Sequence, residues 1–501
     1  MATAPIIENA EISQPKSEKD KWLENIQALL ISVDHDYIQS CSISVVPERL
    51  KIPNEYLYMP RVVSIGPRFM KSREELLLME EVKLRCMLSV LHRGEEKADI
   101  SFDKCSSVVW ELDEVVRASY VVEFELTQPE LAKIILLDGC FLLELLISNS
   151  KKLNSKFPSR LYPPCPTSDV LKDEDVVSDL MLFENQVPIL VLHKLYQTIF
   201  PNVFEQDMEE MVETEEQRKK RAKKINNLAL SVLGYSSLEE PSFKSPHFLD
   251  LVHFFVNKTF ERRVESGDNL KIRMPDINHE KLKVKSCALR LGAAGVSIQV
   301  IEDIVEAEEM KGLDFEFKFN NGKLKISKLN ITKTTKAKWR NLIAWEHHKY
   351  NEKSSETKDQ KTISPRGKFT SFALIFDGLI CCEADLNFLK TKKIIVDHTN
   401  MSNEESKEFF RTMSLGVDPG VVDSAYVTMV AELNNYSSKS FFILGIFKLL
   451  WHLLTIRLEW FVKFLKRNYN FVAMLILLFG FVRVFRSDLL PLIQYIRKLD
   501  E

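Results

Sequence analysis

The stretch Asp179–Tyr196 limits most strictly what this chain can fold into. Two dense apolar runs, Leu180–Phe183 and Val187–Leu192, are separated by Glu184-Asn185-Gln186 and by Pro188. Runs of this composition predict helix on both sides of the polar triplet. Pro188 lacks an N–H, and its ring would clash with the carbonyl of Glu184 at a cost of about 3 kcal/mol in a straight helix. We therefore expect a deeply packed bent helix or hairpin, in which Asn185 and Gln186 bond the freed backbone groups.

Composition favours a globular, helical protein. The 501 residues suffice for two or three domains or for one large helical unit. A content of 45% hydrophobic and 28% charged residues is that of a folded chain, and only 15 glycines argue against a turn-rich all-β fold. The net charge of −3 gives no case for binding nucleic acid, which requires a clustered basic face.

Helical periodicity recurs along most of the chain and predicts one large domain of packed helices over residues 21–440, after a disordered tail at residues 1–20. Two charged or polar loops, 205–224 and 351–368, interrupt it; the basic run inside the first is also compatible with a nuclear-localisation signal. Pro129 suits the first turn of a helix. The expected helices cover Lys21–Val33, Glu74–His92 (with Leu77, Leu84, Met87, Leu88 and Leu91 on its apolar side), Phe102–Tyr120, Pro129–Ile147, Pro246–Phe255, Thr334–Tyr350 and Phe369–Leu389.

Between residues 296 and 326 the pattern changes to alternation of apolar with polar residues, which is typical of strands. Asn320–Gly322 is a good hairpin turn, because Asn and Gly tolerate the positive φ that such a turn needs. We expect a small antiparallel β-sheet inserted in the helical chain.

The C-terminal segment is strongly apolar. Tyr469–Phe485 contains one charge, Arg483, and as a helix would span about 25 Å, slightly less than the roughly 30 Å of a bilayer core. We interpret residues 469–486 as a transmembrane helix and 487–501 as a short tail; a buried core helix is the alternative. Residues 441–468 carry Lys448 within an apolar run, which favours an amphipathic juxtamembrane helix. The N-terminus does not resemble a signal peptide, so we expect a single-pass C-terminal anchor with the large domain in the cytoplasm.

No motif for catalysis, a metal or a cofactor is found. The eight cysteines show no CxxC pair, and Cys381-Cys382 are adjacent, so buried thiols of a reducing compartment are expected. Three carboxylates, Asp138, Asp179 and Glu184, lie inside apolar stretches, where acid–base chemistry with raised pKa values is one interpretation. We favour a structural role, in which Asp138 bonds backbone groups at a helix junction. The chain is therefore not expected to be an enzyme.

Five blocks carry a resemblance. YMPRVVSIGPRF (58–69), LLDGCFLLELL (136–146), FENQVPILVLHKLY (183–196), LRLGAAGVSIQV (289–300) and WRNLIAWEHH (339–348) follow one another as they do in the plant family called domain of unknown function 247, to which the chain is similar from about Ser44 onward. The residues that match the motifs of this family, all expected to be structural, are Gly66, Pro67, Asp138, Gly139, Cys140, Glu144, Glu184, Asn185, Gln186, Pro188, Gly295, Asn341 and Glu346.

The resemblance implies a membrane-anchored plant protein of unknown biochemical activity that acts through protein contacts. Some grass members are linked to self-pollen recognition and others to growth or defence; nothing in this sequence specifies a partner or an oligomeric state. The chain departs from the family at Arg68-Phe69-Met70-Lys71, where Tyr-His-His-Gly is usual, and at Ser44–Pro47. Two alternatives remain, an enzyme that uses Asp138 or Glu184 in an internal cleft and a soluble scaffold.

Overall fold

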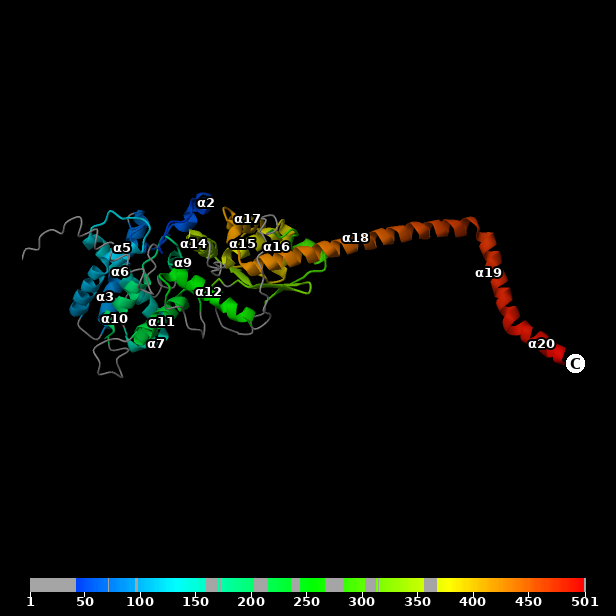
Figure 1. Cartoon of the computed structure of the whole chain (residues 1–501), viewed down its shortest axis with the longest axis horizontal. Coiled ribbons are helices and arrows are strands. Elements are labelled where there is room, and N and C mark those ends of the chain that lie inside the picture. The colour runs from blue at the N-terminus through cyan, green and yellow to red at the C-terminus, as the bar shows by residue number, and fades with distance from the viewer. Residues whose placement is uncertain are drawn as a thin grey trace, which may run out of the picture. The chain divides into compact units, whose positions relative to one another are not determined.

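A computed structural model describes residues 42–70, 72–94, 98–158, 170, 173–201, 215–235, 244–265, 283–301, 312–313, 315–355 and 367–499. The expected N-terminal tail and the helix Lys21–Val33 lie outside these residues. The structure is mainly helical with small sheets (Figure 1). It consists of two compact units, one that extends to Asn434 and one that begins at Asn435.

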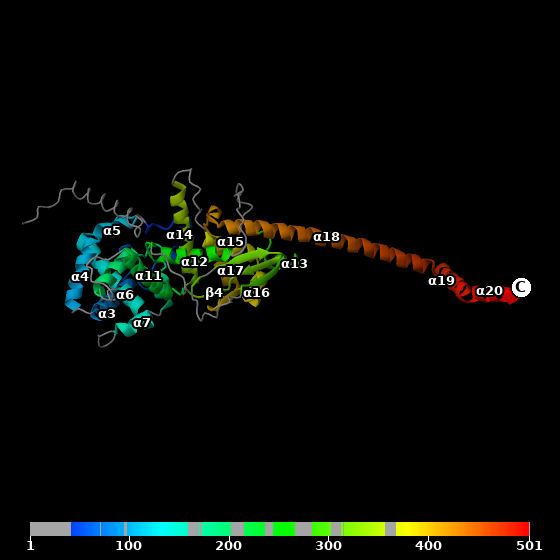
Figure 2. The same cartoon turned by 60° about the horizontal axis from the view of Figure 1, so that its bottom comes forward.

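The first helices of the larger unit pack around one apolar helix, α6 (Gln128–Asn149), which is buried at almost every position from Leu131 to Ile147. Thr127 and Glu130 cap its first turn in both directions, and Pro129 follows at the position expected for it. Five of its neighbours are labelled in the figures, α3, α7 and α11 in both Figures 1 and 2, α10 in Figure 1 and α4 in Figure 2. These are α3 (Glu74–Arg93), α4 (Ala98–Glu111), α7 (Lys151–Lys156), α10 (Ile189–Ile199) and α11 (Glu215–Val232).

The face that α3 turns to the core differs from the predicted one. Leu77, Leu84 and Leu88 are exposed, whereas the buried side includes Lys83. The prediction from apolar residues was wrong because a charged residue, Lys83, is buried on this face, where it pairs with a carboxylate of α6. The remaining elements before residue 301 are α2 (Glu48–Lys51), η1 (Ile52–Tyr58), α5 (Asp113–Ala118), α9 (Glu174–Asp179), α12 (Phe248–Glu265), α13 (Ala288–Ala293) and β1 (Ser297–Val300).

The inserted sheet is mixed, so the prediction of a purely antiparallel sheet is wrong. The hairpin of β2 (Phe317–Asn320) and β3 (Lys323–Ile326) turns at Asn321 and Gly322, which have the predicted positive φ of 49° and 75°. However, β1 pairs with β3 in parallel, and β4 (Leu329–Ile331) pairs in parallel with β5 (Ile395–Asp397). Alternation of apolar and polar residues identifies strands but does not show whether they pair in parallel. In both parallel pairs the two strands are separated by a long stretch of chain, as parallel pairing requires.

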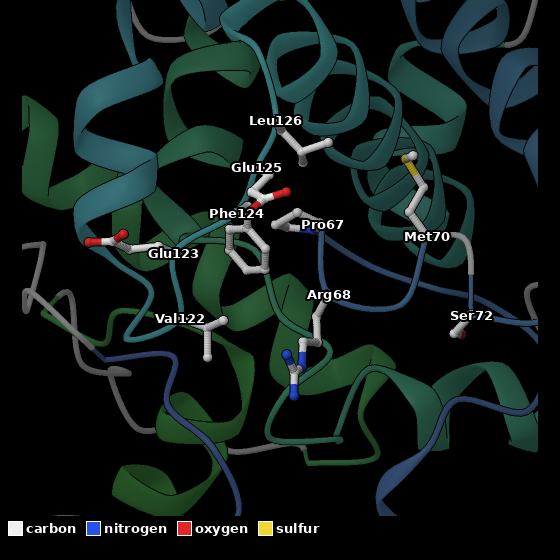
Figure 3. Close-up of a pocket in the computed structure, with 9 residues that line it drawn as sticks. All are labelled: Pro67, Arg68, Met70, Ser72, Val122, Glu123, Phe124, Glu125 and Leu126. Carbon is white, nitrogen blue, oxygen red and sulfur yellow. The ribbon is translucent and has the colours of Figure 1, made fainter.

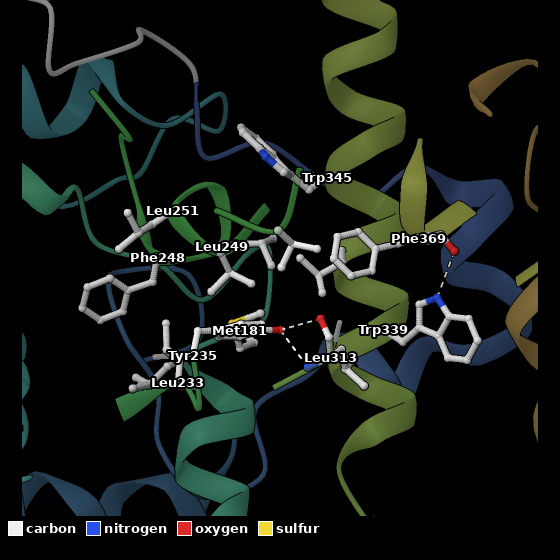
Figure 4. Packing of buried hydrophobic residues seen from close by; sticks show 14 of the residues in the cluster. Met181, Leu233, Tyr235, Phe248, Leu249, Leu251, Leu313, Trp339, Trp345 and Phe369 are labelled. Atoms are coloured by element: carbon white, nitrogen blue, oxygen red, sulfur yellow. Dashed lines mark hydrogen bonds between the residues drawn. The ribbon is translucent and has the colours of Figure 1, made fainter. Parts of the chain in front are cut away.

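Four helices complete the larger unit, and they enclose an aromatic core (Figure 4). Trp339 donates to the carbonyl of Phe369 and packs on Phe315, while Trp345 meets Phe183 edge to face. These helices and a short turn are α14 (Thr335–Ser355), α15 (Lys368–Leu379), α16 (Glu383–Thr391), α17 (Asn403–Ser414) and η4 (Pro419–Val421). Both predicted loops are shorter than expected, because α11 includes residues 215–224 and α14 continues to Ser355.

The C-terminal segment consists of α18 (Ser424–Arg467), α19 (Tyr469–Val484), the π-turn η5 (Phe485–Leu489) and α20 (Leu490–Leu499). The predicted transmembrane helix 469–486 is wrong. A break at Asn468 and the π-turn limit α19 to 16 residues, about 24 Å, short of the roughly 30 Å required. Over the described residues, none of the helices combines the length and the apolar character that a membrane crossing needs.

Candidate functional site: a closed polar network and the groove beside it

The stretch around Pro188 folds as a turn between two helices. Helix α9 ends at Asp179, and α10 starts directly after Pro188. The run Leu180–Phe183 is therefore not helical, contrary to the prediction, although it is fully buried. The predicted role of the two amides is confirmed. Asn185 donates to the carbonyl of Asp179 at 2.9 Å, and Gln186 donates to those of Leu180 and Leu182 at 2.8 and 2.7 Å.

The same turn holds the first sequence block in place. Asp179 accepts from the amides of Arg61, Val62 and Val63 at 2.7–3.1 Å. Asn185 accepts from the amide of Ile65 at 2.7 Å and donates to the carbonyl of Val63. Burial raises the pKa of Asp179 to about 6, against the opposing effect of the three amides. Side chains of this turn thus supply the backbone partners of a block that lies more than a hundred residues earlier in the chain.

Asp138 closes this arrangement from α6. It accepts from the amide of Gly66 at 2.7 Å and forms an ion pair of 2.7 Å with Lys83, which also donates to the carbonyl of Ser64. Burial raises the pKa of Asp138, and Lys83 opposes that shift. Burial lowers the pKa of Lys83, but the charges of Asp138 and Glu80 outweigh this effect, so the pKa of Lys83 lies above its usual value. The expectation that Asp138 bonds a backbone group is confirmed, but Asp138 lies in the interior of α6 and not at a helix junction.

Two glycines allow this close approach. Gly66 has φ +76°, and a Cβ there would lie 2.6 Å from the carbonyl oxygen of Gln186. A Cβ on Gly139 would lie 2.5 Å from Leu195 of α10, so α6 and α10 could not pack at this distance. Gly295 also has a positive φ of 83°, but it lies at the turn from α13 into β1 and takes no part in this region.

The other motif residues are placed in the same way. Glu144 binds Arg93 at 2.7 Å, Asn341 accepts from the amide of Phe183 at 2.9 Å, and Glu346 accepts from the amides of Phe369 and Thr370 in the first turn of α15. Cys140 is buried in the core. We call the interconnected set the motif network, and it consists of Gly66, Lys83, Asp138, Asp179, Glu184, Asn185, Gln186 and Asn341.

Sequence reasoning missed one large member of the core, Arg340. Its side chain is fully buried and donates to the carbonyls of Leu50, Met413 and Leu415 and to the hydroxyl of Tyr58. Because an arginine within WRNLIAWEHH is also compatible with an exposed helix face, the sequence carries no clear signal for this role.

A groove of about 440 Å³ opens at the edge of the motif network (Figure 3). One wall is the turn after Gly66, and the other is the extended connector Val122–Leu126 that leads into α6. Arg68 lines the groove and also contacts the motif network, since it donates to Glu184 at 3.1 Å. We call this the acidic groove, and its lining is Pro67, Arg68, Met70, Ser72, Val122, Glu123, Phe124, Glu125 and Leu126.

The connector was overlooked in the sequence, although Val-Glu-Phe-Glu-Leu alternates as a strand does. Val122, Phe124 and Leu126 are half-buried, whereas Glu123 and Glu125 are exposed. Arg68 and Met70, two of the lining residues, lie in the segment Arg68–Lys71. A second hollow that touches Glu184 holds only about 10 Å³, too little for more than one water.

Fold and site together define a class: a helical scaffold in which distant sequence blocks lock one another through buried polar groups. Comparison of the sequence gives the family. The pattern of domain of unknown function 247, described as "Plant protein of unknown function", matches residues 43–482, and the chain belongs to this family.

Two Arabidopsis thaliana proteins are similar to most of the chain. UPF0481 protein At3g47200 is 26% identical over 419 residues, which cover 80% of this chain and 78% of the relative. A second UPF0481 protein, At3g02645, is 22% identical over 488 residues, or 82% of this chain and 85% of the relative. No solved structure matches the chain.

Proposed function

We propose that this plant protein acts through protein contacts and that the acidic groove is its docking site for an extended segment of a partner protein. The observation that carries the proposal is the connector Val122–Leu126, an extended and alternating segment that forms one wall of an open groove. Roles in self-recognition, growth or defence, which the family resemblance implies, would all depend on such a contact.

The connector offers the two features that extended peptides use. From Glu123 to Glu125 its backbone groups form no hydrogen bond with any other residue that the structure describes. The backbone of an incoming strand can therefore hydrogen-bond to this backbone, and every second side chain of that strand can contact the groove. Met70 and Phe124 provide apolar surface on its sides.

Charge specifies the partner further. Within the described residues, neither Glu123 nor Glu125 forms an ion pair, while Arg68 is already neutralised by Glu184. The groove thus presents two unmatched negative charges at its rim. A segment that alternates Lys or Arg with apolar residues is the complementary ligand.

The state of the buried carboxylates supports this proposal over an enzyme. Asp138 and Glu184 are 1% and 3% exposed, and their oxygens are engaged by Lys83, Arg68 and backbone amides. The hollow next to Glu184 has no room for a substrate. Closed packing of this kind is what a structural role requires.

The test is proximity labelling in plant cells with the full chain. We compare the native chain with Glu123→Lys/Glu125→Lys, and with a control that reverses the two exposed charges Glu55 and Glu432 elsewhere. The native chain and the control are expected to label the same protein neighbours, and the groove variant is expected to lose a subset of them. Identical neighbours for all three would overturn the proposal.

A further inference from the structure

Three thiols and one carboxylate meet at a place far from the acidic groove in sequence. Cys287 directly precedes α13, Cys381 and Cys382 lie between α15 and α16, and Asp385 is in the first turn of α16. Helices α13 and α16 pack on each other. One donor atom each of Cys287, Cys381 and Asp385 lies within 4.8 Å of the other two.

The carboxylate is the centre of this cluster. Oδ2 of Asp385 accepts from the thiols of Cys381 at 3.0 Å and Cys382 at 3.2 Å, and Oδ1 accepts from the amide of Leu289 at 2.9 Å. Asp385 is fully buried and Cys287 is 8% exposed, whereas Cys381 and Cys382 are exposed. The cluster therefore has fixed donors on the inside and an open path on the outside.

We propose that Cys287, Cys381 and Asp385 bind a zinc ion, with the thiol of Cys382 as the fourth donor. Zinc takes four ligands in a tetrahedron, at about 2.3 Å from sulfur and about 2.0–2.2 Å from carboxylate oxygen. Donors on one such ion are about 3–4 Å apart, and those of Cys287, Cys381 and Asp385 lie within 4.8 Å of one another, so side-chain rotations must bring them closer. The sulfur of Cys382 lies 3.2 Å from Asp385 and must rotate towards the other two sulfurs. Thiolates with one carboxylate suit zinc and not magnesium or calcium, which prefer oxygen ligands.

Protonation is consistent with a site that exchanges protons for metal. The hydrogen bond to Asp385, together with burial, raises the pKa of the Cys381 thiol, so without a metal its proton stays on sulfur. Burial raises the pKa of Asp385, but the hydrogen bonds from Cys381, Leu289, Cys287 and Cys382 hold it at about 2. Zinc displaces one proton from each thiol that it binds.

The ion would connect two segments that are remote in the chain, the one that enters α13 and the one that enters α16. The sequence does not indicate this site, because Cys287 and Cys381 are separated by 94 residues in no known ligand spacing. The site is independent of the proposed docking groove and can be present whether or not that proposal holds.

The first experiment uses the reduced native chain and cobalt(II) as a spectroscopic probe for the zinc site. We expect one cobalt per chain, a sulfur-to-cobalt charge-transfer band in the near ultraviolet, and loss of that band when zinc is added. Affinity should rise with pH, because thiol protons must leave. A native chain without the charge-transfer band overturns the proposal.

The second experiment assigns the ligands. Cys287→Ser, Cys381→Ser and Asp385→Asn should each lower zinc affinity by about tenfold or more, since loss of even an outer-shell partner costs about 10–100-fold. Cys105→Ser, which removes another buried thiol, should not change it. Circular dichroism of each variant reports whether it is folded. Equal affinity in folded variants and native chain overturns the proposal.

A third measurement needs no variant. In the native chain, exposed Cys382 should react with iodoacetamide, and zinc should protect it, as mass spectrometry of peptides can show. Equal alkylation with and without zinc contradicts the site.

Discussion

The motif network and the acidic groove share the ion pair of Arg68 and Glu184, yet they are opposite in character. In the network every buried charge meets a partner: Lys83 faces Asp138, and Asp179 faces three amides. In the groove, Glu123 and Glu125 face solvent without an ion-pair partner among the described residues. The comparison teaches that the blocks by which the family is known encode packing, while the proposed docking surface lies next to them.

The largest effect is expected where a buried charge loses its partner. Lys83→Met should lower the free energy of unfolding by about 3–5 kcal/mol, because Asp138 then remains charged and buried. Denaturant unfolding measures this. The double variant Lys83→Met/Asp138→Asn should recover most of the loss, since Asn still accepts from Gly66. If the double variant is no more stable than Lys83→Met, the pair does not act as described.

Low pH should destabilise the folded chain, because buried histidines that are neutral in the closed core, the packed interior that contains His247, would have to be protonated. His247 is fully buried, accepts from the amide of Asp250, and burial lowers its pKa to about 4. The unfolded chain binds this proton at an ordinary pKa near 6.5, so stability is complete above pH 6.5 and falls towards pH 4, by up to about 3 kcal/mol.

Unfolding measured across this pH range should show the loss, and His247→Gln should flatten it in part. His193 and His347, with pKa values also lowered to about 4 by burial, contribute in the same direction. As a control, His92→Gln should leave the profile unchanged because His92 is only half-buried. A stability that stays constant between pH 6.5 and 4 would contradict the closed core.

Asn185→Ala should cost about 1–3 kcal/mol, since it strands the amide of Ile65 and the carbonyl of Val63 in a buried site and removes one of the two donors to the carbonyl of Asp179. The matched control is Asn149→Ala, because the amide of Asn149 bonds only Leu145 of its own helix. Chemical denaturation of both variants makes the comparison. Equal losses would show that the turn before Pro188 is not held by Asn185.

The smallest effect on stability is expected in the acidic groove. Glu123→Lys/Glu125→Lys should change the free energy of unfolding by less than about 0.5 kcal/mol, because both side chains are exposed and without a partner in the described structure. Thermal unfolding next to the native chain checks this. A large destabilisation would mean that the groove, like the network, is part of the packing.

The sequence predicted the parts of this contrast that depend on local chemistry. The break at Pro188, the roles of Asn185 and Gln186, the backbone contact of Asp138 and the turn at Asn321-Gly322 all follow from what those residues can bond or which φ they tolerate. The break, the amide bonds and the turn are each decided within a few residues of the chain, so single-sequence reasoning reaches them. For Asp138 only the kind of contact was predicted, since its partner Gly66 is 72 residues away.

What it could not predict depends on partners far away in the chain. The buried face of α3 contains Lys83 because Asp138 lies opposite it on another helix, and Leu180–Phe183 is turned and not helical because remote amides occupy Asp179. The cysteine cluster joins residues 94 positions apart. The apolar composition of residues 469–486 suggested a membrane span, but composition does not show that the helix ends after 16 residues.

The most direct test of the central claim is binding of a fluorescent synthetic peptide that alternates lysine with valine, followed by anisotropy with the purified full chain. The account predicts that the native chain binds it, more weakly as salt screens the charges, and that Glu123→Lys/Glu125→Lys loses about tenfold or more in affinity, the equivalent of about 1.4 kcal/mol. The control with Glu55 and Glu432 reversed should bind as the native chain does. Equal affinity of all three chains, or no binding by the native chain, would contradict it.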